Sequence, residues 1–337
     1  MATVEVERVS GIPMIDFSAF SIEKKTRPPA ENEEVQLLVK QLLHAFSTVG
    51  FVFLKNYGIS QDEIDTVFDV MDKFFNADKA SKLKYSKWDD VLQNGWDKLE
   101  KERHRKSLIF SNNPDRPADL KESFDIGHIY EDTFKWPDDE VPEFKPTIKG
   151  MYEKVEILGL RILSAIALGL GMDADTFTSQ YQHMGTQKGM TALRLNFYPK
   201  LKGDIDVKPE QIRCGEHTDY GGVSILFQDE CGGLEVQNVE GKYIPVTPVK
   251  GAVIVNIADL MQRWTSDRLK STFHRVIVPE SIKKERDRRS AVFFFNPDRD
   301  ATITCLDGQN KYLPIKSSDY ITSRLASGYS IPVPVQQ

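Results

Sequence analysis

Hydrophobic positions in the first half of the chain recur with the period of an α-helix. One helix that ends near residue 50 has its apolar face at Val35, Leu38, Leu42 and Phe46. The same spacing predicts a second helix over 59–75, with Ser60 as its N-cap and Glu63 three residues later to complete a capping box. A third helix is expected from about 146 to 169.

The pattern changes after residue 190, where short segments rich in Val, Ile and Phe are separated by Gly, Pro, Asn and Asp. Such spacing is typical of a sandwich or jelly roll. A strand is also expected within 50–59, and a closing helix at "SSDYITSRLASGY". The polar segment 76–121 fits neither period, and we interpret it as a candidate flap over a site. The pattern as a whole predicts an α+β fold.

Composition narrows the class of protein. The 337 residues are 40% hydrophobic and 28% charged, with a net charge of -6, which argues against a nucleic-acid partner. Three scattered cysteines fit a reducing compartment. No apolar run approaches the ~20 residues of a membrane span, and the N-terminus does not resemble a signal peptide. We therefore expect a cytoplasmic protein without a membrane partner.

The stretch "EHTDYGGVSIL" contains the first candidate for chemistry. His217 and Asp219 are two positions apart, so in a strand or its exit they point to the same side, and Thr218 points away. Gly221 and Gly222 would let the chain turn after them. Taken alone, the pattern is also compatible with a plain turn in which the Asp caps the backbone.

A second histidine strengthens the metal interpretation. His274 lies in another strand pattern, "STFHRVIVP", which a barrel can bring beside the first. Two histidines and one carboxylate on one face of a metal leave the other face open, and this arrangement binds non-haem Fe(II). The same three ligand types also serve zinc in hydrolases, so that alternative stays open here.

Two further pairs of polar residues could bind an acidic ligand. Arg288 and Ser290 share one face of a strand, and a guanidinium fork suits a carboxylate. Asn196 and Tyr198 are spaced in the same way in "RLNFYP". The alternatives are a surface ion pair for Arg288 and a core position for Tyr198.

Several linked motifs together carry a family resemblance. From about residue 11 to 329 the chain contains, in order, "GIPMIDFSAF", "GFVFLKNYGI", "KESFDIG", "LRLNFYP", "EHTDYGGVSILFQD", "GGLEVQ", "GAVIVNIADLMQRWTSDRLKSTFHRVI" and "RRSAVFFFNP". This set resembles the Fe(II)- and 2-oxoglutarate-dependent oxygenases of the isopenicillin N synthase-like superfamily. The resemblance implies a double-stranded β-helix core, a cupin-like jelly roll, with N-terminal and flanking helices. We expect an N-terminal dioxygenase region over 1–120 and the jelly-roll core with its closing helix over 121–337, in one compact unit.

The resemblance also implies roles for individual residues. The iron ligands would be His217, Asp219 and His274. The distal carboxylate of 2-oxoglutarate would be held by Arg288 and Ser290, and the part of the co-substrate nearer the metal would be contacted by Asn196 and Tyr198. Three residues are candidates for the substrate side, each with a core or surface alternative: Phe294, Arg194 and Trp264.

The implied activity is oxidation of a small-molecule metabolite, in secondary metabolism, by O2 and 2-oxoglutarate, with release of succinate and CO2. The outcome would be hydroxylation, desaturation or oxidative cyclisation, and ascorbate is expected to stimulate it. We expect a monomer or a weak homodimer. Two alternatives remain at this point: an iron oxidase that works without 2-oxoglutarate, and a catalytically silent binding protein on the same fold.

Overall fold

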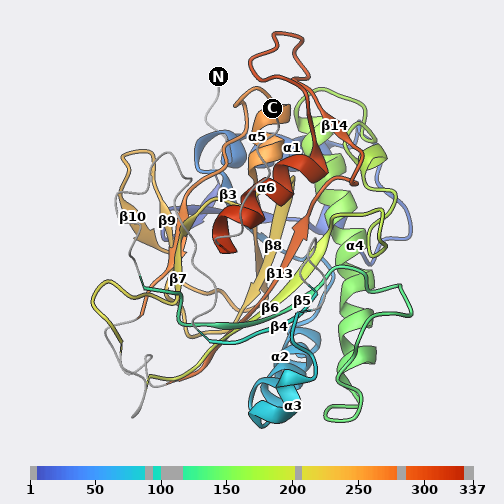
Figure 1. Cartoon of the computed structure of the whole chain (residues 1–337). Coiled ribbons are helices and arrows are strands. Elements are labelled where there is room, and N and C mark those ends of the chain that lie inside the picture. The colour runs from blue at the N-terminus through green and yellow to red at the C-terminus, as the bar shows by residue number, and fades with distance from the viewer. Residues whose placement is uncertain (1–5, 88–93, 100–116, 202–206, 279–285, 330–337) are drawn as a thin grey trace.

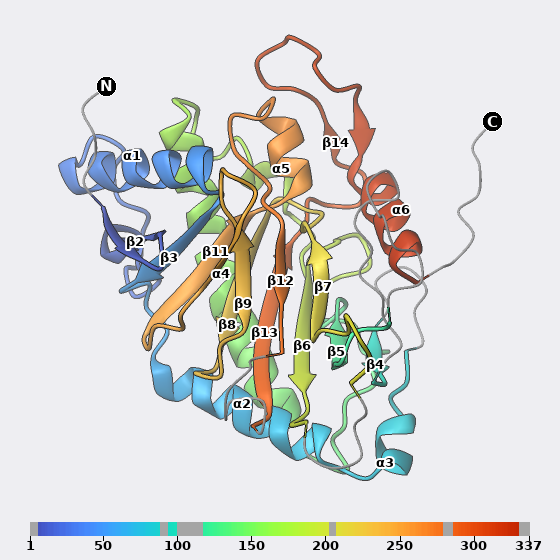
Figure 2. The same cartoon turned by 90° about the vertical axis from the view of Figure 1, so that its left-hand side faces the viewer.

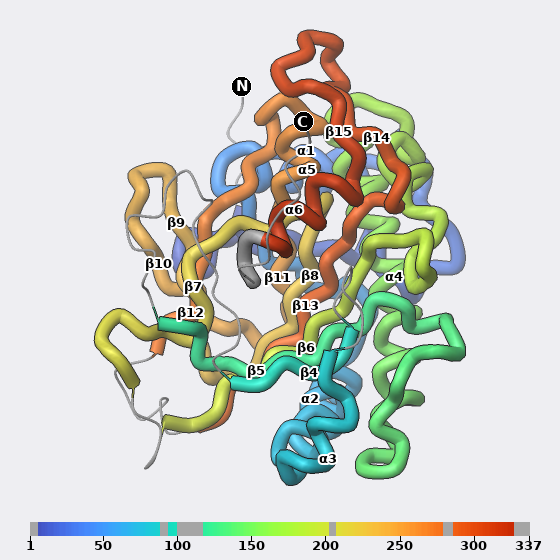
Figure 3. The backbone as a smooth tube through the Cα atoms, in the orientation of Figure 1, coloured from blue at the N-terminus to red at the C-terminus, as the bar shows by residue number. Residues whose placement is uncertain are grey.

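Two facing β-sheets form the centre of the protein, shown by a computed structural model that describes residues 6–87, 94–99, 117–201, 207–278 and 286–329 (Figures 1 and 3). The larger sheet has nine strands in the spatial order β1 (Glu7–Val9), β2 (Ile12–Asp16), β3 (Phe51–Lys55), β11 (Ala252–Ile257), β8 (Val223–Gln228), β13 (Arg288–Phe295), β6 (Ala192–Tyr198), β5 (Glu122–Ile126) and β4 (Gly95–Asp97). The smaller sheet has the order β10 (Tyr243–Pro245), β9 (Leu234–Gln237), β12 (His274–Val276) and β7 (Cys214–His217). The strands β14 (Thr302–Ile303) and β15 (Ile315–Lys316) pair antiparallel in a separate two-stranded sheet.

Helices cover the outer face of the larger sheet and the edges of the core. They are α1 (Glu33–Thr48), α2 (Gln61–Phe75), α3 (Lys79–Leu83), α4 (Phe144–Gly169), α5 (Asp259–Trp264) and α6 (Ser317–Tyr329), with the 3-10 turns η1 (Ser18–Phe20) and η2 (Thr178–Gln180). The smaller sheet, the larger sheet and α4 lie side by side as three layers in Figure 1, and Figure 2 shows α4 behind the strands. The predicted α+β jelly roll is confirmed.

The helices predicted from periodicity are confirmed, with small shifts at their ends. Ser60 and Glu63 form the expected capping box at the start of α2. The long helix α4 begins at Phe144, two residues before Pro146, because the first turn of a helix does not need the N–H that proline lacks. Among the described residues, none of the helices combines the length and the apolarity that a membrane span requires.

The alternation along β13 separates two environments. Ala291, Phe293 and Phe295 belong to the apolar core under the helices. Arg288 and Ser290 point the other way, between the two sheets, and line a cavity there. The strand thus packs on the core through Ala291, Phe293 and Phe295, and directs the buried polar groups of Arg288 and Ser290 into the cavity.

One glycine of α4 allows the helix to pack closely on β13. A Cβ atom on Gly159 would collide with the ring of Phe295. The missing side chain therefore leaves the space that the ring fills, and the helix lies nearer to the sheet than any other residue would permit.

The segment 76–121 is described in part. It contains α3 and β4, and β4 pairs with β5 at the edge of the larger sheet. The remainder of the predicted flap, 88–93 and 100–116, lies outside the described residues. The larger sheet takes strands from both sides of residue 120, and the boundary at that residue stays a prediction.

Candidate metal centre

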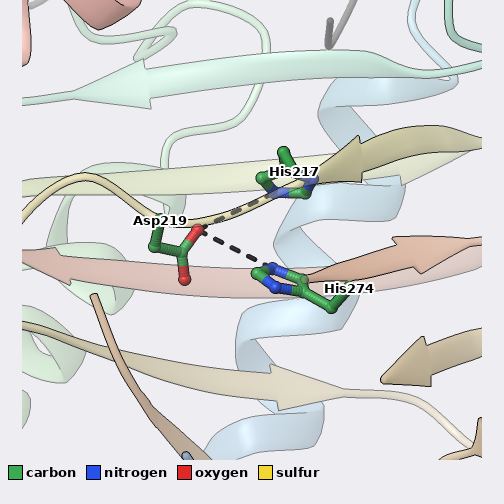
Figure 4. Close-up of side chains that lie close together, drawn as sticks. All are labelled: His217, Asp219 and His274. Atoms are coloured by element: carbon green, nitrogen blue, oxygen red, sulfur yellow. Dashed lines mark ion pairs between the residues drawn. The ribbon is translucent and has the colours of Figure 1, made fainter. Parts of the chain in front are cut away.

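Three side chains of the smaller sheet and its exit loop converge on one point (Figure 4). His217 ends β7 and His274 begins β12, and the two residues are direct cross-strand partners. Asp219 follows His217 by two residues. The Nε2 atoms of both histidines lie 3.7 Å from Asp219 Oδ1. The candidate ligand atoms all lie within 4.8 Å of one another, and among the described residues this is the one such group of three.

Backbone carbonyls orient both imidazole rings. The Nδ1 atom of His217 is 2.7 Å from Gly215 O, and that of His274 is 3.1 Å from Thr272 O. A carbonyl oxygen only accepts hydrogen bonds, so each Nδ1 carries a proton, and Nε2 is the ring nitrogen left to bind a metal. The Nε2 atoms of both rings face the Asp219 carboxylate, and a histidine binds a metal through such a nitrogen.

The carboxylate of Asp219 is held from one side. Asn256 on β11 donates its Nδ2 hydrogen to Asp219 Oδ2 over 2.7 Å, and both residues are buried. Oδ1 is the oxygen that faces the two histidines. Thr218, between the ligands, points away and donates to Asp259, as the alternation predicts. The site therefore offers one carboxylate oxygen and two imidazole nitrogens.

Gly221 and Gly222 have a different role from the one expected. Neither has a positive φ, so the turn does not depend on their conformational freedom. A Cβ atom would instead collide with Asn296 at position 221 and with the hydroxyl of Tyr181 at position 222. The two glycines let neighbouring chain segments approach the ligand loop closely.

The second polar cluster lies on the larger sheet, facing the same cavity as the three ligands. Arg288 pairs across the strands with Tyr198, and Ser290 pairs with Asn196. The predicted pairs are thus neighbours on one surface, from adjacent strands β13 and β6. The ring of Tyr198 lies under the Arg288 guanidinium, at 4.8 Å.

Arg288 is a buried cation with neutral neighbours. It is 1% exposed, which excludes the surface ion pair considered for it. Its guanidinium donates to Gly232 O at 2.8 Å, to Gln228 Oε1 at 2.9 Å and to Ser290 Oγ at 3.4 Å. No carboxylate of the described residues pairs with it. A buried charge without a counter-ion is costly, and an anionic ligand would remove that cost.

The other two residues supply further hydrogen-bonding groups to the cavity. Burial raises the pKa of Tyr198, so its phenol stays protonated at neutral pH and can donate. Asn196 is buried, and its Oδ1 has no hydrogen-bond partner among the described residues. These groups, together with Arg288 and Ser290, fit a small dicarboxylate with a keto group.

Two of the three candidates for the substrate side line the cavity, namely Phe294 and Arg194. The Arg194 guanidinium forms a two-pronged ion pair with Asp125, at 2.6 and 3.0 Å, and lies 6.0 Å from the centre of the Phe294 ring. Asp125 also pairs with Lys87, which in turn pairs with Asp97, so two cations and two carboxylates offset one another here. Phe294 is half-buried, as expected for a cavity wall rather than for the core.

Trp264 requires a correction. The described residues that line the cavity do not include it. Residues 259–264 form the short helix α5, and the core alternative given for Trp264 is the one that the structure has. The helix turns Trp264 into the core, where its ring meets Phe177 edge-on at 5.1 Å.

Two residues near the ligands were missed by the sequence reasoning. Asn256 and Asp259 both belong to "VNIAD", where polar residues interrupt or end an apolar run. A buried amide inside an apolar strand is a signal, because it needs a hydrogen-bond partner. The identity of that partner, Asp219, follows only from the pairing of β11 with β8.

Comparison with known proteins agrees with this geometry. Residues 190–297 match the 2OG-Fe(II) oxygenase superfamily, and residues 12–147 match the N-terminal region described as non-haem dioxygenase in morphine synthesis. The chain is 32% identical to the 2-oxoglutarate-dependent dioxygenase ecdK of Aspergillus rugulosus over 285 residues, which cover 79% of this chain and 84% of that protein.

Two more relatives extend the comparison. The 2-oxoglutarate-Fe(II) type oxidoreductase ppzD of Metarhizium majus is 33% identical over 323 residues, covering 86% of this chain and 89% of that protein. The crystal structure of a full-length Neurospora crassa protein in complex with alpha-KG and thymine superposes with a TM-score of 0.79 at 34% identity, over 94% of this chain and 97% of that one. The chain therefore belongs to the superfamily of Fe(II)- and 2-oxoglutarate-dependent oxygenases, and its cofactors are Fe(II) and 2-oxoglutarate.

Proposed function

We propose that this oxygenase is a dioxygenase that oxidises a small-molecule metabolite and releases succinate and CO2. In this proposal His217, Asp219 and His274 bind the iron, and Arg288 with Ser290 binds the far carboxylate of 2-oxoglutarate. The single observation that carries the assignment is the buried Arg288, which has no carboxylate partner among the described residues and shares a cavity with the three ligands.

When bound, the iron supplies activation of O2, with electrons from the oxidative decarboxylation of 2-oxoglutarate. The chain's own residues bind and orient. The carbonyls of Gly215 and Thr272 hold the two imidazoles with Nε2 toward the metal. Three protein ligands on one side leave the other positions for the co-substrate and O2.

Groups beyond the ligands orient the co-substrate. Arg288 and Ser290 fix its distal end, since a guanidinium holds a carboxylate in a defined plane. The protonated phenol of Tyr198, beside Arg288, would donate a further hydrogen bond to the co-substrate, and Asn196 lies two residues away on the same strand.

The substrate is proposed to lie beside Phe294 and Arg194, which line the cavity with the ligands. Arg194 is ion-paired with Asp125, and together with Phe294 it offers hydrogen bonds and an aromatic surface to the substrate. The Neurospora crassa protein was crystallised with thymine, a small ring compound, which supports a substrate of small size here. Product mass separates hydroxylation, which adds one oxygen atom, from desaturation and cyclisation, which each remove two hydrogen atoms; NMR of the product separates the last two.

The test is an anaerobic titration of the purified protein with Fe(II) and then 2-oxoglutarate. We expect the weak visible charge-transfer band of the chelate in the wild type and no band in Asp219→Ala. Oxygen uptake is then measured with and without 2-oxoglutarate, and with ascorbate. Uptake that needs no 2-oxoglutarate would favour the oxidase alternative, and a protein that binds neither iron nor co-substrate would favour the silent binding protein.

A further inference from the structure

We propose that Asp259 is a positioning residue that holds both arms of the iron site, and that helix α6 acts on the site through it. This inference rests on the proposed function, because it concerns the geometry of the same three ligands. Asp259 lies in the first turn of α5, outside the cavity that those ligands line.

The carboxylate of Asp259 connects the two ligand-bearing segments. Its Oδ2 accepts a hydrogen bond from Thr218 Oγ1 at 3.2 Å, and its Oδ1 accepts one from Ser271 Oγ at 2.7 Å. Thr218 stands between His217 and Asp219, and Ser271 lies three residues before His274. A single side chain thus bonds to both segments, beside His217 and Asp219 in one and near His274 in the other.

Backbone contacts fix the same loop at the start of α5. The N–H of Asp259 donates to Asp219 O at 2.9 Å. The next N–H, that of Leu260, donates to Gly221 O at 2.9 Å, and Ala258 N–H donates to Gly222 O at 3.0 Å. A displacement of Asp259 would therefore move the main chain that carries the carboxylate ligand.

Helix α6 reaches this point with two side chains. The hydroxyl of Tyr320 donates to Asp259 Oδ2 at 2.9 Å. Arg324 Nη2 lies 3.5 Å from the same oxygen and donates to Thr218 Oγ1 at 3.2 Å, and its guanidinium lies over the ring of Tyr220, at 4.8 Å. In Figure 1, α6 crosses in front of the two sheets. The C-terminal helix is thus bonded directly to the ligand loop.

The burial and charge of the cluster favour a defined geometry. The Asp259 side chain is 14% exposed and that of Arg324 is 19% exposed, so the pair is largely shielded from water. Three hydroxyl donors and one guanidinium converge on one carboxylate from three segments of the chain. Hydrogen bonds to a charged group are strong and directional, so such a set holds its members in one arrangement.

The test compares metal binding in Asp259→Asn, Tyr320→Phe and Ser323→Ala. Ser323 lies on α6, is exposed and, among the described residues, bonds within its own helix, to Tyr320 O, so Ser323→Ala is the matched control. The probe is Co(II) alone, titrated anaerobically and followed by its visible absorption. The melting temperature of each metal-free variant is measured in parallel.

We expect Asp259→Asn to weaken Co(II) binding about 10-fold and Tyr320→Phe about threefold. Loss of a residue that bonds directly to a metal ligand costs about 10- to 100-fold in metal affinity. The effects here should be at or below the lower end of that range, because Asp259 and Tyr320 act on the ligands only through the loop that carries them. The absorption spectrum of saturated Asp259→Asn should also change shape, which a purely structural role would not cause. Ser323→Ala should bind as the wild type does.

Wild-type affinity and spectrum in both variants, with only a lower melting temperature, would overturn the positioning role and leave the proposed function intact. A wild type that binds no Co(II) would overturn the metal site and this inference together. If Asp259→Asn does not fold, Tyr320→Phe and Ser271→Ala give the answer, because each removes one hydroxyl from the cluster.

Discussion

The two faces of β13 are both buried, yet they have opposite chemistry. Toward the helices, Phe293 and Phe295 are 1% and 0% exposed and lie in the main apolar core. Toward the smaller sheet, Arg288 and Ser290 are equally buried but polar. Apolar packing stabilises the fold on one face, whereas the other face keeps a charge that packing alone would not favour. The difference separates residues that stabilise the fold from residues that are proposed to bind the co-substrate.

The largest effect is expected from a substitution on the face of β13 that packs against the apolar core. Phe293→Ala should lower the free energy of unfolding by about 3–5 kcal/mol, because it leaves a cavity in the core. The dissociation constants for iron and 2-oxoglutarate should stay near the wild-type values at a temperature where the variant is folded. Urea unfolding and equilibrium titration measure the two quantities. A large loss of affinity with little loss of stability would contradict the assignment of this face.

Arg288→Met tests the polar face with a side chain of similar length. Losing the partner of a bound carboxylate should weaken 2-oxoglutarate binding by about 2–5 kcal/mol. The free energy of unfolding without co-substrate should change by less than about 1 kcal/mol, since removing a buried unpaired charge offsets the lost hydrogen bonds. Arg289→Met, on the opposite side of the strand, is the control and should keep normal 2-oxoglutarate affinity.

A smaller effect on stability is expected from the ionisation of Asp125, whose partner Arg194 lines the cavity. Burial would raise the pKa of Asp125, but Arg194 and Lys87 outweigh it and hold the pKa below the usual value. Below about pH 3.9 the unfolded chain takes up a proton that the folded protein does not, so stability falls by up to about 1.4 kcal/mol per pH unit. This contribution is fully present at higher pH.

Urea unfolding between pH 5 and pH 3 checks the pH effect, with wild type and Asp125→Asn compared at each pH. The variant lacks the titrating group, so its curve against pH should be flatter in the acid range, although it is less stable at pH 5. Parallel curves for the two proteins would show that Asp125 is not the group responsible.

Residues whose neighbours are local were predictable from the sequence. The apolar faces of the helices, and the shared strand face of Arg288 and Ser290, depend only on spacing along the chain. The structure has both as expected. The convergence of His217 and His274 required a distant pairing, which the family resemblance supplied.

What the sequence did not reveal depends on contacts between distant segments. Asn256 looks like one polar residue in an apolar strand until β11 pairs beside β8 and brings it to Asp219. Trp264 follows a strand directly, yet the chain there turns into a helix and directs the ring inward. Gly221 and Gly222 resemble a flexible turn, but their need for space arises from Asn296 and Tyr181, which no local pattern indicates.

The close fit of Gly159 against Phe295 links the outer layer to the iron site. The carbonyl of Phe295 accepts a hydrogen bond from Gly222 N–H at 2.8 Å, and Gly222 lies in the ligand loop. A single methyl group added on the helix would push the ring, then the strand end, and then that loop. A substitution in the outer layer would therefore displace the ligand loop, although Gly159 and Gly222 are far apart in the sequence.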